Sequence, residues 1–477
     1  MKDIKTPKYS FLELISMSFS VCVGLGIFII SVQVLGKFQR ETMGNLVYLA
    51  FIIGAIPAFF SAFIAGVSSS IWPSYGGDYA YLTRKVSHFW GFINTWGYWF
   101  VIPMQIQGAA ITGTVILAHF FRLAGFLDLS SLITNNLLVI STILMGIGFL
   151  VNYTGMEGKI TLITSGITLV LLVLFIYYGM GHNYNDFLSI TEAKESFIKT
   201  LESSHYPHIT LKGLLMGTAV LMFSYGGVTF SQNAGAEVQT EVKRKIWKGI
   251  IIALTLATAF YIIVSYVLYK AVPWQYIYVK VGEIKNFTAI DAIAIYIPAP
   301  VYMLITFLLF TAVFDNMFML GFRSARHGYA ASMDGFFNWG KALTRVSRRF
   351  STPVVQIAIV YVIAFLILIF ITNPELGFYA NFSYTFGLMV TSYMPFKIKE
   401  EELKEVFPKN TKNILKAMRI MGVISMVVYL FMIVGLYTAV IKMAVVWTAL
   451  LGMGGVLYYI ETHRNTQIID NLRKIHQ

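Results

Sequence analysis

Long apolar runs alternate with short polar segments along most of this chain. Each run is close to the ~20 residues with which an α-helix crosses a bilayer. The alternation therefore predicts an all-α integral membrane protein with twelve transmembrane helices. Their expected limits are 11–36, 45–70, 89–121, 132–152, 156–181, 210–236, 246–271, 298–325, 352–372, 374–396, 416–437 and 439–460, with a tight turn at Asn373-Pro374.

The composition supports a chain whose surface faces lipid. Hydrophobic residues make up 57% of the sequence and charged residues only 12%, whereas a soluble domain carries about 25% charged residues. The first apolar run is longer than the core of a secretory signal, which spans roughly 7–15 residues, so we interpret it as a retained span. The single cysteine, Cys22, excludes an internal disulfide framework.

Basic residues predict the orientation. With the N-terminus placed inside, most Lys and Arg residues fall in inside segments, as the positive-inside rule requires. We therefore expect a multi-pass protein of the cell membrane with both termini in the cytoplasm. These scattered basic loops also account for the net charge of +13, so no nucleic-acid partner is predicted.

Two of the predicted spans contain glycines near their middle. The first reads VCVGLGIFII at 21–30, and the sixth contains FSYGG at 223–227. Glycine costs a helix about 1 kcal/mol relative to alanine, and an unwound helix in hydrocarbon is tolerated only around a polar cavity. Gly-interrupted spans in corresponding positions of two halves indicate a transporter binding site. The alternative is that these glycines only allow close helix packing.

The two breaks lie five spans apart, which indicates a repeat. Because five is odd, the second half would be inserted upside down relative to the first. The expected parts are the cytoplasmic N-terminus 1–10, the first inverted repeat 11–181, an extracellular loop 182–209, the second inverted repeat 210–396 with an amphipathic extracellular segment 272–297 that is a candidate lid, a cytoplasmic loop 397–415, two further helices 416–460 and a cytoplasmic tail 461–477.

We predict that a substrate lies between the two breaks. Freed backbone N–H groups at a half-helix attract a carboxylate, and freed carbonyls attract an ammonium group. Neither break contains a carboxylate side chain, which favours a neutral amino acid over a basic one or a polyamine. The expected substrate-binding residues are Val23, Gly24, Leu25, Gly26, Ile27, Phe223, Ser224, Tyr225, Gly226 and Gly227.

Five motifs, in this order, resemble those of the amino acid–polyamine–organocation (APC) superfamily of transporters. They are GLGIF at 24–28, PSYGGDYAYLTR at 73–84, FSYGG at 223–227 followed by Glu237, RHGYAASMDG at 326–335 and TPVV at 352–355. The resemblance implies an amino acid permease with the leucine-transporter fold, a 5+5 inverted repeat, and alternating access for amino acids or related amines.

Asp315 is the carboxylate that we place well inside a span. In the related fold, span 8 passes the cation site beside the broken first helix, so Asp315 is the candidate for binding a coupling H⁺ or Na⁺. A carboxylate that leaves water for a cavity of low dielectric constant holds its proton more tightly. The alternative is a structural ion pair with Arg323 or Arg326. The gating candidates are Asp78, Arg84 and Arg326, as one inner network, and Glu237, which closes span 6.

These observations predict a secondary active transporter for amino acids, with H⁺ and Na⁺ as the candidate coupling ions and with symport and exchange both left open. An exchanger, a polyamine or organocation carrier of the same fold, an ion channel and a membrane-embedded enzyme are the alternatives. The sequence contains no GxSxG, HExxH or Walker pattern, so no catalytic residue, metal or cofactor is predicted. The expected partners are an amino acid or amine and the lipid bilayer, and the oligomeric state is left open.

Overall fold

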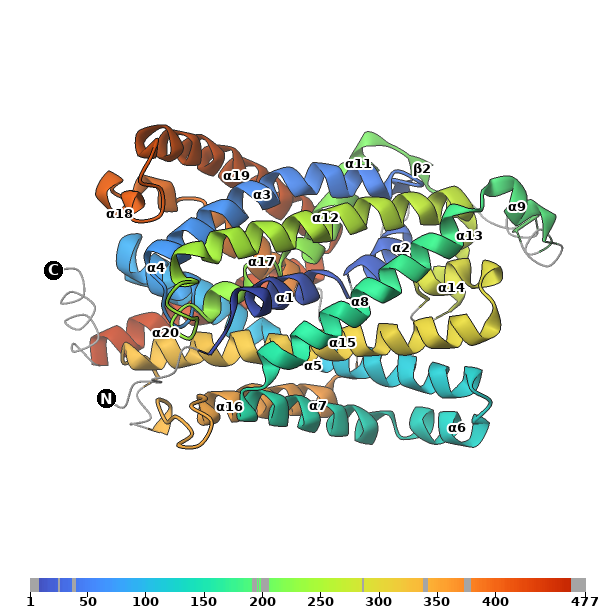
Figure 1. The fold of residues 1–477 in the computed structure, drawn as a ribbon, viewed down its shortest axis with the longest axis horizontal. Coiled ribbons are helices and arrows are strands. Elements are labelled where there is room, and N and C mark those ends of the chain that lie inside the picture. The colour runs from blue at the N-terminus through green and yellow to red at the C-terminus, as the bar shows by residue number, and fades with distance from the viewer. Residues whose placement is uncertain are drawn as a thin grey trace.

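The long helices of the chain run roughly along one axis (Figure 1). α4, Asp78–Lys85, and α18, Glu400–Lys404, lie at one end of this axis, and α6, Leu127–Asn135, and α13, Trp274–Glu283, lie at the other. We call these the α4 end and the α13 end; the predicted orientation makes the α4 end cytoplasmic. The computed structural model describes residues 8–24, 26–36, 40–190, 195, 197–198, 206–284, 287–337, 342–372 and 379–464.

Nine helical segments of the described chain are long and apolar enough to cross a membrane. They are the first span, Phe11–Gly36, and α3 (Val47–Ile71), α5 (His88–Leu123), α7 (Leu137–Thr154), α8 (Glu157–Met180), α12 (Ile246–Ala271), α15 (Ala299–Met333), α19 (Thr411–Ala439) and α20 (Ile441–Arg464). The other three predicted spans contain shorter helices, α11 (Leu211–Leu221), α16 (Val354–Phe370) and α17 (Tyr379–Thr391). The predicted all-α membrane fold is confirmed. The number of crossings stays a prediction, and the turn at Asn373-Pro374 lies outside the described residues.

The remaining elements are short and lie at the ends of the bundle or within the two broken spans. In the first span, α1 (Phe11–Cys22) is followed by the π-helix η1 (Gly26–Ile30), α2 (Ser31–Gln33) and η2 (Val34–Gly36). The others are β1 (Glu41–Thr42), which pairs in parallel with β2 (His208–Ile209), α9 (Tyr184–Ser189), η3 (Met222–Tyr225), η4 (Phe230–Asn233), η5 (Lys243–Lys245), α14 (Ala289–Ile293), η6 (Ala294–Tyr296) and η9 (Met394–Phe396).

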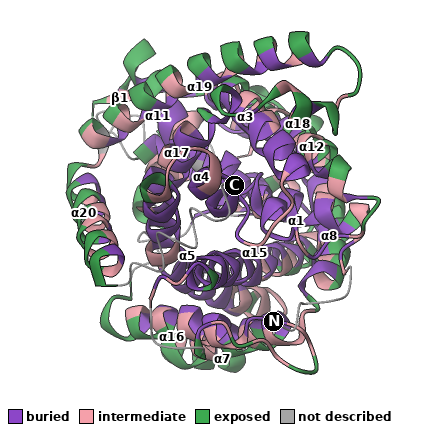
Figure 2. Ribbon diagram, turned by 90° about the vertical axis from the view of Figure 1, so that its left-hand side faces the viewer, coloured by how far each residue is buried: buried purple, intermediate pink, exposed green. Residues whose placement is uncertain are grey.

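The centre of the bundle is formed by α5 and α15, which pack along each other. Figure 2 shows both helices as buried, whereas α7, α8, α19 and α20 lie on the outside with exposed residues. Large apolar side chains are exposed there, including Phe431 at 72% and Tyr177 at 73%. A helix exterior this apolar is suited to lipid rather than water. The protein is therefore a multi-pass membrane protein.

Two segments differ from the sequence-based description. α15 continues to Met333, so Arg326 is a helical residue and not a loop residue. The stretch after Arg326 contains no proline, and the helix ends just before Gly335, whose φ is +99°. In the predicted lid, α14 is not a surface helix: Ala289, Ile290 and Ile293 are buried, and the helix packs against η1, α8 and α12.

Candidate site between two broken helices

The first and sixth spans are both interrupted at the predicted glycines, and the two breaks touch. α1 ends at Cys22, and the chain resumes as η1 at Gly26. In the sixth span, α11 gives way to η3, to turns at 226–229 and then to η4. A Cβ added at Gly26 would lie 2.5 Å from the Ser224 Oγ and 3.1 Å from the Ser224 Cα. Gly26 is therefore required by the close approach of the two breaks.

The other glycines of the breaks differ in how closely they are packed. At Gly24 an added Cβ would meet its nearest atoms at 3.6 Å, which is ordinary contact. Gly226 lies against the ring of Tyr384, and Gly227 lies against Val21. Close packing thus explains three of the four glycines, and it also holds the two breaks side by side. Leu25 lies outside the described residues, as does the side chain of Phe223.

Tyr261 connects the breaks, and the sequence analysis did not identify it. Its hydroxyl lies 2.5 Å from the Cys22 carbonyl oxygen and 2.7 Å from the Ser224 carbonyl oxygen. Tyr225, a predicted binding residue, donates its hydroxyl proton to the Phe51 carbonyl at 2.8 Å. The Ser224 Oγ is buried and has no hydrogen-bond partner among the described residues. Ser224 therefore supplies the free polar side chain at the junction, whereas the Tyr225 hydroxyl is already engaged.

Asp315 lies in α15 beside the first break and is 1% exposed. Its Oδ1 accepts a hydrogen bond from the Thr161 hydroxyl at 2.9 Å, and its Oδ2 has no partner among the described residues. The next residue, Asn316, donates its Nδ2 to the Val21 carbonyl at 3.0 Å. A buried carboxylate without a cation is costly unless it binds a proton or a metal ion. The alternative ion pairs, with Arg323 or Arg326, are absent because both arginines pair elsewhere.

At the α4 end, Arg326 holds two buried carboxylates. Its Nε lies 2.7 Å from the Glu237 Oε1, and its Nη2 lies 3.1 Å from the Glu157 Oε1. Glu157 also accepts the hydroxyl proton of Tyr9 at 2.5 Å. The side chains of Arg326 and Glu157 are 0% exposed, and that of Glu237 is 1% exposed. These contacts join the segment before α1, the end of span 6, α8 and α15.

Asp78 belongs to a second group of contacts. Its carboxylate accepts hydrogen bonds from His327 at 2.7 Å and from Asn94 at 2.9 Å, and it lies 3.5 Å from Arg323. Burial alone would raise the pKa of Asp78, but His327, Arg323 and Asn94 outweigh it and lower the pKa to about 2. These three contacts therefore favour the charged form of the Asp78 carboxylate.

Arg84 belongs to a third group, in which it lies 3.5 Å from Asp334. Asp334 accepts the hydroxyl proton of Tyr79 at 2.7 Å. Burial raises the pKa of Asp334, and the nearby Arg84 and Tyr79 oppose that rise. The structure thus distributes Asp78, Arg84 and Arg326 over three separate groups, and Glu237 joins the group of Arg326. The predicted single network of Asp78, Arg84 and Arg326 is not formed.

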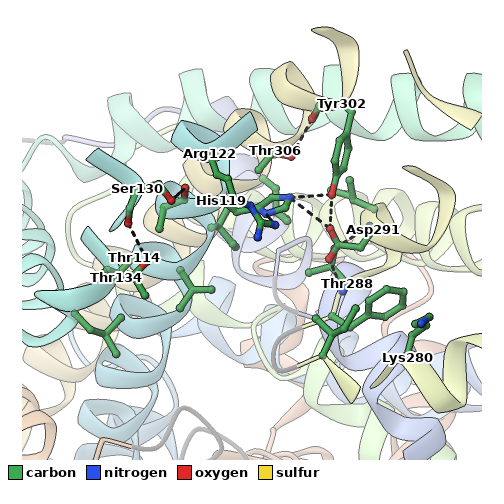
Figure 3. Close-up of a pocket in the computed structure, with 18 of the residues that line it drawn as sticks. Thr114, His119, Arg122, Ser130, Thr134, Lys280, Thr288, Asp291, Tyr302 and Thr306 are labelled. Carbon is green, nitrogen blue, oxygen red and sulfur yellow. Dashed lines mark hydrogen bonds and ion pairs between the residues drawn. The ribbon is translucent and has the colours of Figure 1, made fainter. Parts of the chain in front are cut away.

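A cavity of about 620 Å³ lies at the α13 end, away from the breaks (Figure 3). A chain of hydrogen bonds crosses it: Arg122 donates to His119 Nδ1 at 2.8 Å, His119 Nε2 meets the Tyr302 hydroxyl at 2.9 Å, and Tyr302 donates to Asp291 at 2.6 Å. Asp291 also accepts from Thr288 as the cap of α14. These hydrogen bonds connect α14 to the ends of α5 and α15 that lie at the α13 end.

Fold comparison identifies the architecture. The structure is similar to the crystal structure of MhsT in complex with L-phenylalanine, with a TM-score of 0.60 over 90% of this chain and 99% of that chain, at 16% sequence identity. MhsT has the leucine-transporter fold, and this chain shares it. This likeness shows the fold of the chain.

Sequence comparison identifies the family. The sequence profile of the family "Amino acid permease" matches residues 9–399, so the chain belongs to the amino acid permease family. It is 26% identical over 282 residues to the "Cationic amino acid transporter 4, vacuolar" of Arabidopsis thaliana, a match that covers 56% of this chain and only 44% of that protein. It is 24% identical over 356 residues to the "Methylthioribose transporter" of Bacillus subtilis, which covers 72% of this chain and 70% of that protein. The predicted resemblance is confirmed.

Proposed function

We propose that this protein is a secondary active transporter that carries a neutral amino acid by alternating access, driven by protons that bind Asp315. The observation that carries the proposal is the junction of two interrupted membrane helices at Gly26 and Ser224. Interrupted half-helices present backbone N–H and carbonyl groups inside the membrane, where an amino acid offers the complementary carboxylate and ammonium groups.

The hydrogen bonds around the breaks indicate which backbone groups remain to bind the substrate. The carboxylate would meet N–H groups near Gly24–Gly26 and Ser224–Gly227. The carbonyls of Val21, Cys22 and Ser224 already accept bonds from Asn316 and Tyr261. The carbonyls of Val23, Gly24 and Phe223 are therefore the better acceptors for the ammonium group.

The charge around the breaks favours a neutral substrate. A basic amino acid or a polyamine needs a carboxylate for its second cation, and the described break residues contain none. Phe230, which follows the second break, instead packs against the guanidinium group of Arg323, a buried cation. Relatives of the family include a cationic amino acid transporter and a methylthioribose transporter by name, so these substrate classes belong in the test.

A panel of radiolabelled substrates in proteoliposomes tests the substrate class. We expect saturable uptake of one or more neutral amino acids, and no competition by polyamines or basic amino acids at equal concentration. Methylthioribose and a basic amino acid serve as the contrasting substrates. Uptake of either one in place of the neutral amino acids would refute the neutral class, and single-channel currents would refute a carrier mechanism.

Replacing Asp315 with asparagine tests the coupling, because asparagine mimics the protonated carboxyl group permanently. Asp315→Asn should retain substrate binding and exchange but lose accumulation driven by a pH gradient. A gradient of one pH unit can support about a tenfold accumulation per proton, equivalent to about 1.4 kcal/mol. The measurement is the ratio of internal to external substrate with the outside acidic. Asp128→Asn, in the exposed helix α6, is the matched control, and concentrative uptake by Asp315→Asn would contradict the assignment.

A further inference from the structure

Arg323 is a buried cation enclosed by aromatic rings. It lies in α15, two helical turns beyond Asp315 toward the α4 end, and its side chain is 0% exposed. Its guanidinium carbon lies 4.0 Å from the ring centroid of Tyr98, 4.5 Å from that of Phe230 and 5.6 Å from that of Tyr384. We call these three rings the arginine cage. They come from α5, η4 and α17, so the cage joins three segments far apart in the sequence.

Arg323 makes few polar contacts for a guanidinium group: in the described part of the chain, the Asp78 carboxylate and the Tyr98 hydroxyl are the groups near it. A guanidinium group has five N–H donors, yet none of its three nitrogens donates a hydrogen bond to a described residue. Its guanidinium group lies 3.5 Å from the Asp78 carboxylate, which already accepts hydrogen bonds from His327 and Asn94. Cation–π contacts attract a desolvated cation, but they offset only part of the cost of burying charged donors.

The arginine cage lies between the broken helices and the α4 end. Tyr384 packs against Gly226 in the second break, and its hydroxyl bonds to Gln105 at 2.6 Å. Phe230 starts η4, the half of span 6 that leads from the break toward the α4 end. The ring centroids of Tyr384 and Phe230 lie 6.3 Å apart, and both rings contact the guanidinium group of Arg323. We therefore infer that a molecule moving from the junction along this half of span 6 would displace these rings and reach Arg323.

We propose that Arg323 is a second binding site for the carboxylate group of the substrate, used as the amino acid passes between the junction and the α4 end. This site rests on the proposed amino acid transport. The planar fork of a guanidinium group binds a carboxylate through two parallel hydrogen bonds. The closed cage leaves these donors without a hydrogen bond of ordinary geometry, and a carboxylate that enters it supplies two acceptors. Arg323 is thus a substrate-contacting residue outside the two breaks.

The test compares substrate affinity from the two faces of the membrane. Intact cells present the face predicted to carry the α13 end, and inverted membrane vesicles present the other. In Arg323→Gln, the KM measured from the α4 face should rise at least tenfold relative to the KM from the α13 face. The matched control is Arg244→Gln, which removes an exposed arginine at the same end and should leave the ratio as in the wild type. An unchanged ratio in Arg323→Gln would overturn the proposal.

Two further measurements cover the case in which Arg323→Gln fails to fold. Arg323→Lys keeps the charge but cannot form two parallel bonds, so it should raise the same ratio by about threefold. In the wild type, the deaminated monocarboxylate analogue of the substrate should inhibit more strongly at the α4 face than at the α13 face. Equal inhibition at both faces refutes the carboxylate site. Absence of amino acid transport by the wild type instead refutes the proposed function, so the two failures are distinguishable.

Discussion

Gly26→Val is expected to abolish uptake while the protein remains folded. An added Cβ at Gly26 already lies 2.5 Å from the Ser224 Oγ, and the two methyl groups of valine extend further into the second break. Overpacking of this kind costs about 1–3 kcal/mol, and here it separates the half-helices that hold the substrate. We expect the affinity for the amino acid to fall by up to about a hundredfold, since 1.4 kcal/mol corresponds to tenfold. Equilibrium binding to the purified protein in detergent measures this directly.

A second glycine in a membrane helix provides the control. A Cβ added at Gly166, in α8, meets no other atom within 4 Å. Gly166→Val therefore makes the same chemical change without the collision and should bind and transport as the wild type does. A monodisperse elution profile for both variants excludes unfolding as the cause. Wild-type affinity in Gly26→Val would contradict the placement of the substrate between the breaks.

Arg326→Gln is expected to destabilise the protein strongly. The substitution leaves Glu157 and Glu237 buried without the cation that they share. Removing one partner of a buried ion pair costs about 3–5 kcal/mol. We expect the melting temperature in detergent to fall by roughly 5–10 °C. The control is Arg84→Gln, because Arg84 is 30% exposed in its pair with Asp334, and exposed pairs contribute about 0–1 kcal/mol.

A double variant separates the lost charge from the lost volume. If uncompensated carboxylates cause the destabilisation, Arg326→Gln combined with Glu237→Gln should melt at a higher temperature than Arg326→Gln alone. If lost packing is the cause, the double variant should melt at a lower temperature than Arg326→Gln, because the second substitution removes further contacts. A melting temperature for Arg326→Gln equal to that of Arg84→Gln would show that the cluster does not stabilise this state.

Much of the architecture could be predicted because it is local in sequence. The apolar runs give the helices, and glycines within two of them mark the breaks near Gly26 and Gly227. Asp315 stands out because a carboxylate is rare in an apolar run. Each of these signals needs only a window of about 20 residues, the length of one membrane-spanning helix. The direct contact between Gly26 and Ser224 and the separate ion-pair groups of the α4 end needed the structure.

The residues that the sequence analysis missed depend on contacts between distant segments. Tyr261 is one of many tyrosines, and only the fold brings it to the Cys22 carbonyl, 239 positions away. Glu157 stands at the beginning of a span in the sequence, and only the fold buries it against Tyr9, 148 positions away. Arg323 is considered from the sequence only as an ion-pair partner of Asp315, and His327 lies in a motif that assigns it no role, so their contacts with Asp78 needed the fold. Partners of this kind follow from helix packing, which no periodicity within one segment specifies.

The Tyr261 hydroxyl couples the two half-helices through hydrogen bonding. A phenol carries one proton, and this one lies within bonding distance of both the Cys22 and the Ser224 carbonyls. This proton can form a full hydrogen bond with only one of the two carbonyls at a time. A positive group that takes the Ser224 carbonyl turns the proton to Cys22, and a positive group at Cys22 turns it to Ser224. Binding of a positive group at one break therefore changes the hydrogen bonding of the carbonyl at the other break, without any movement of the backbone.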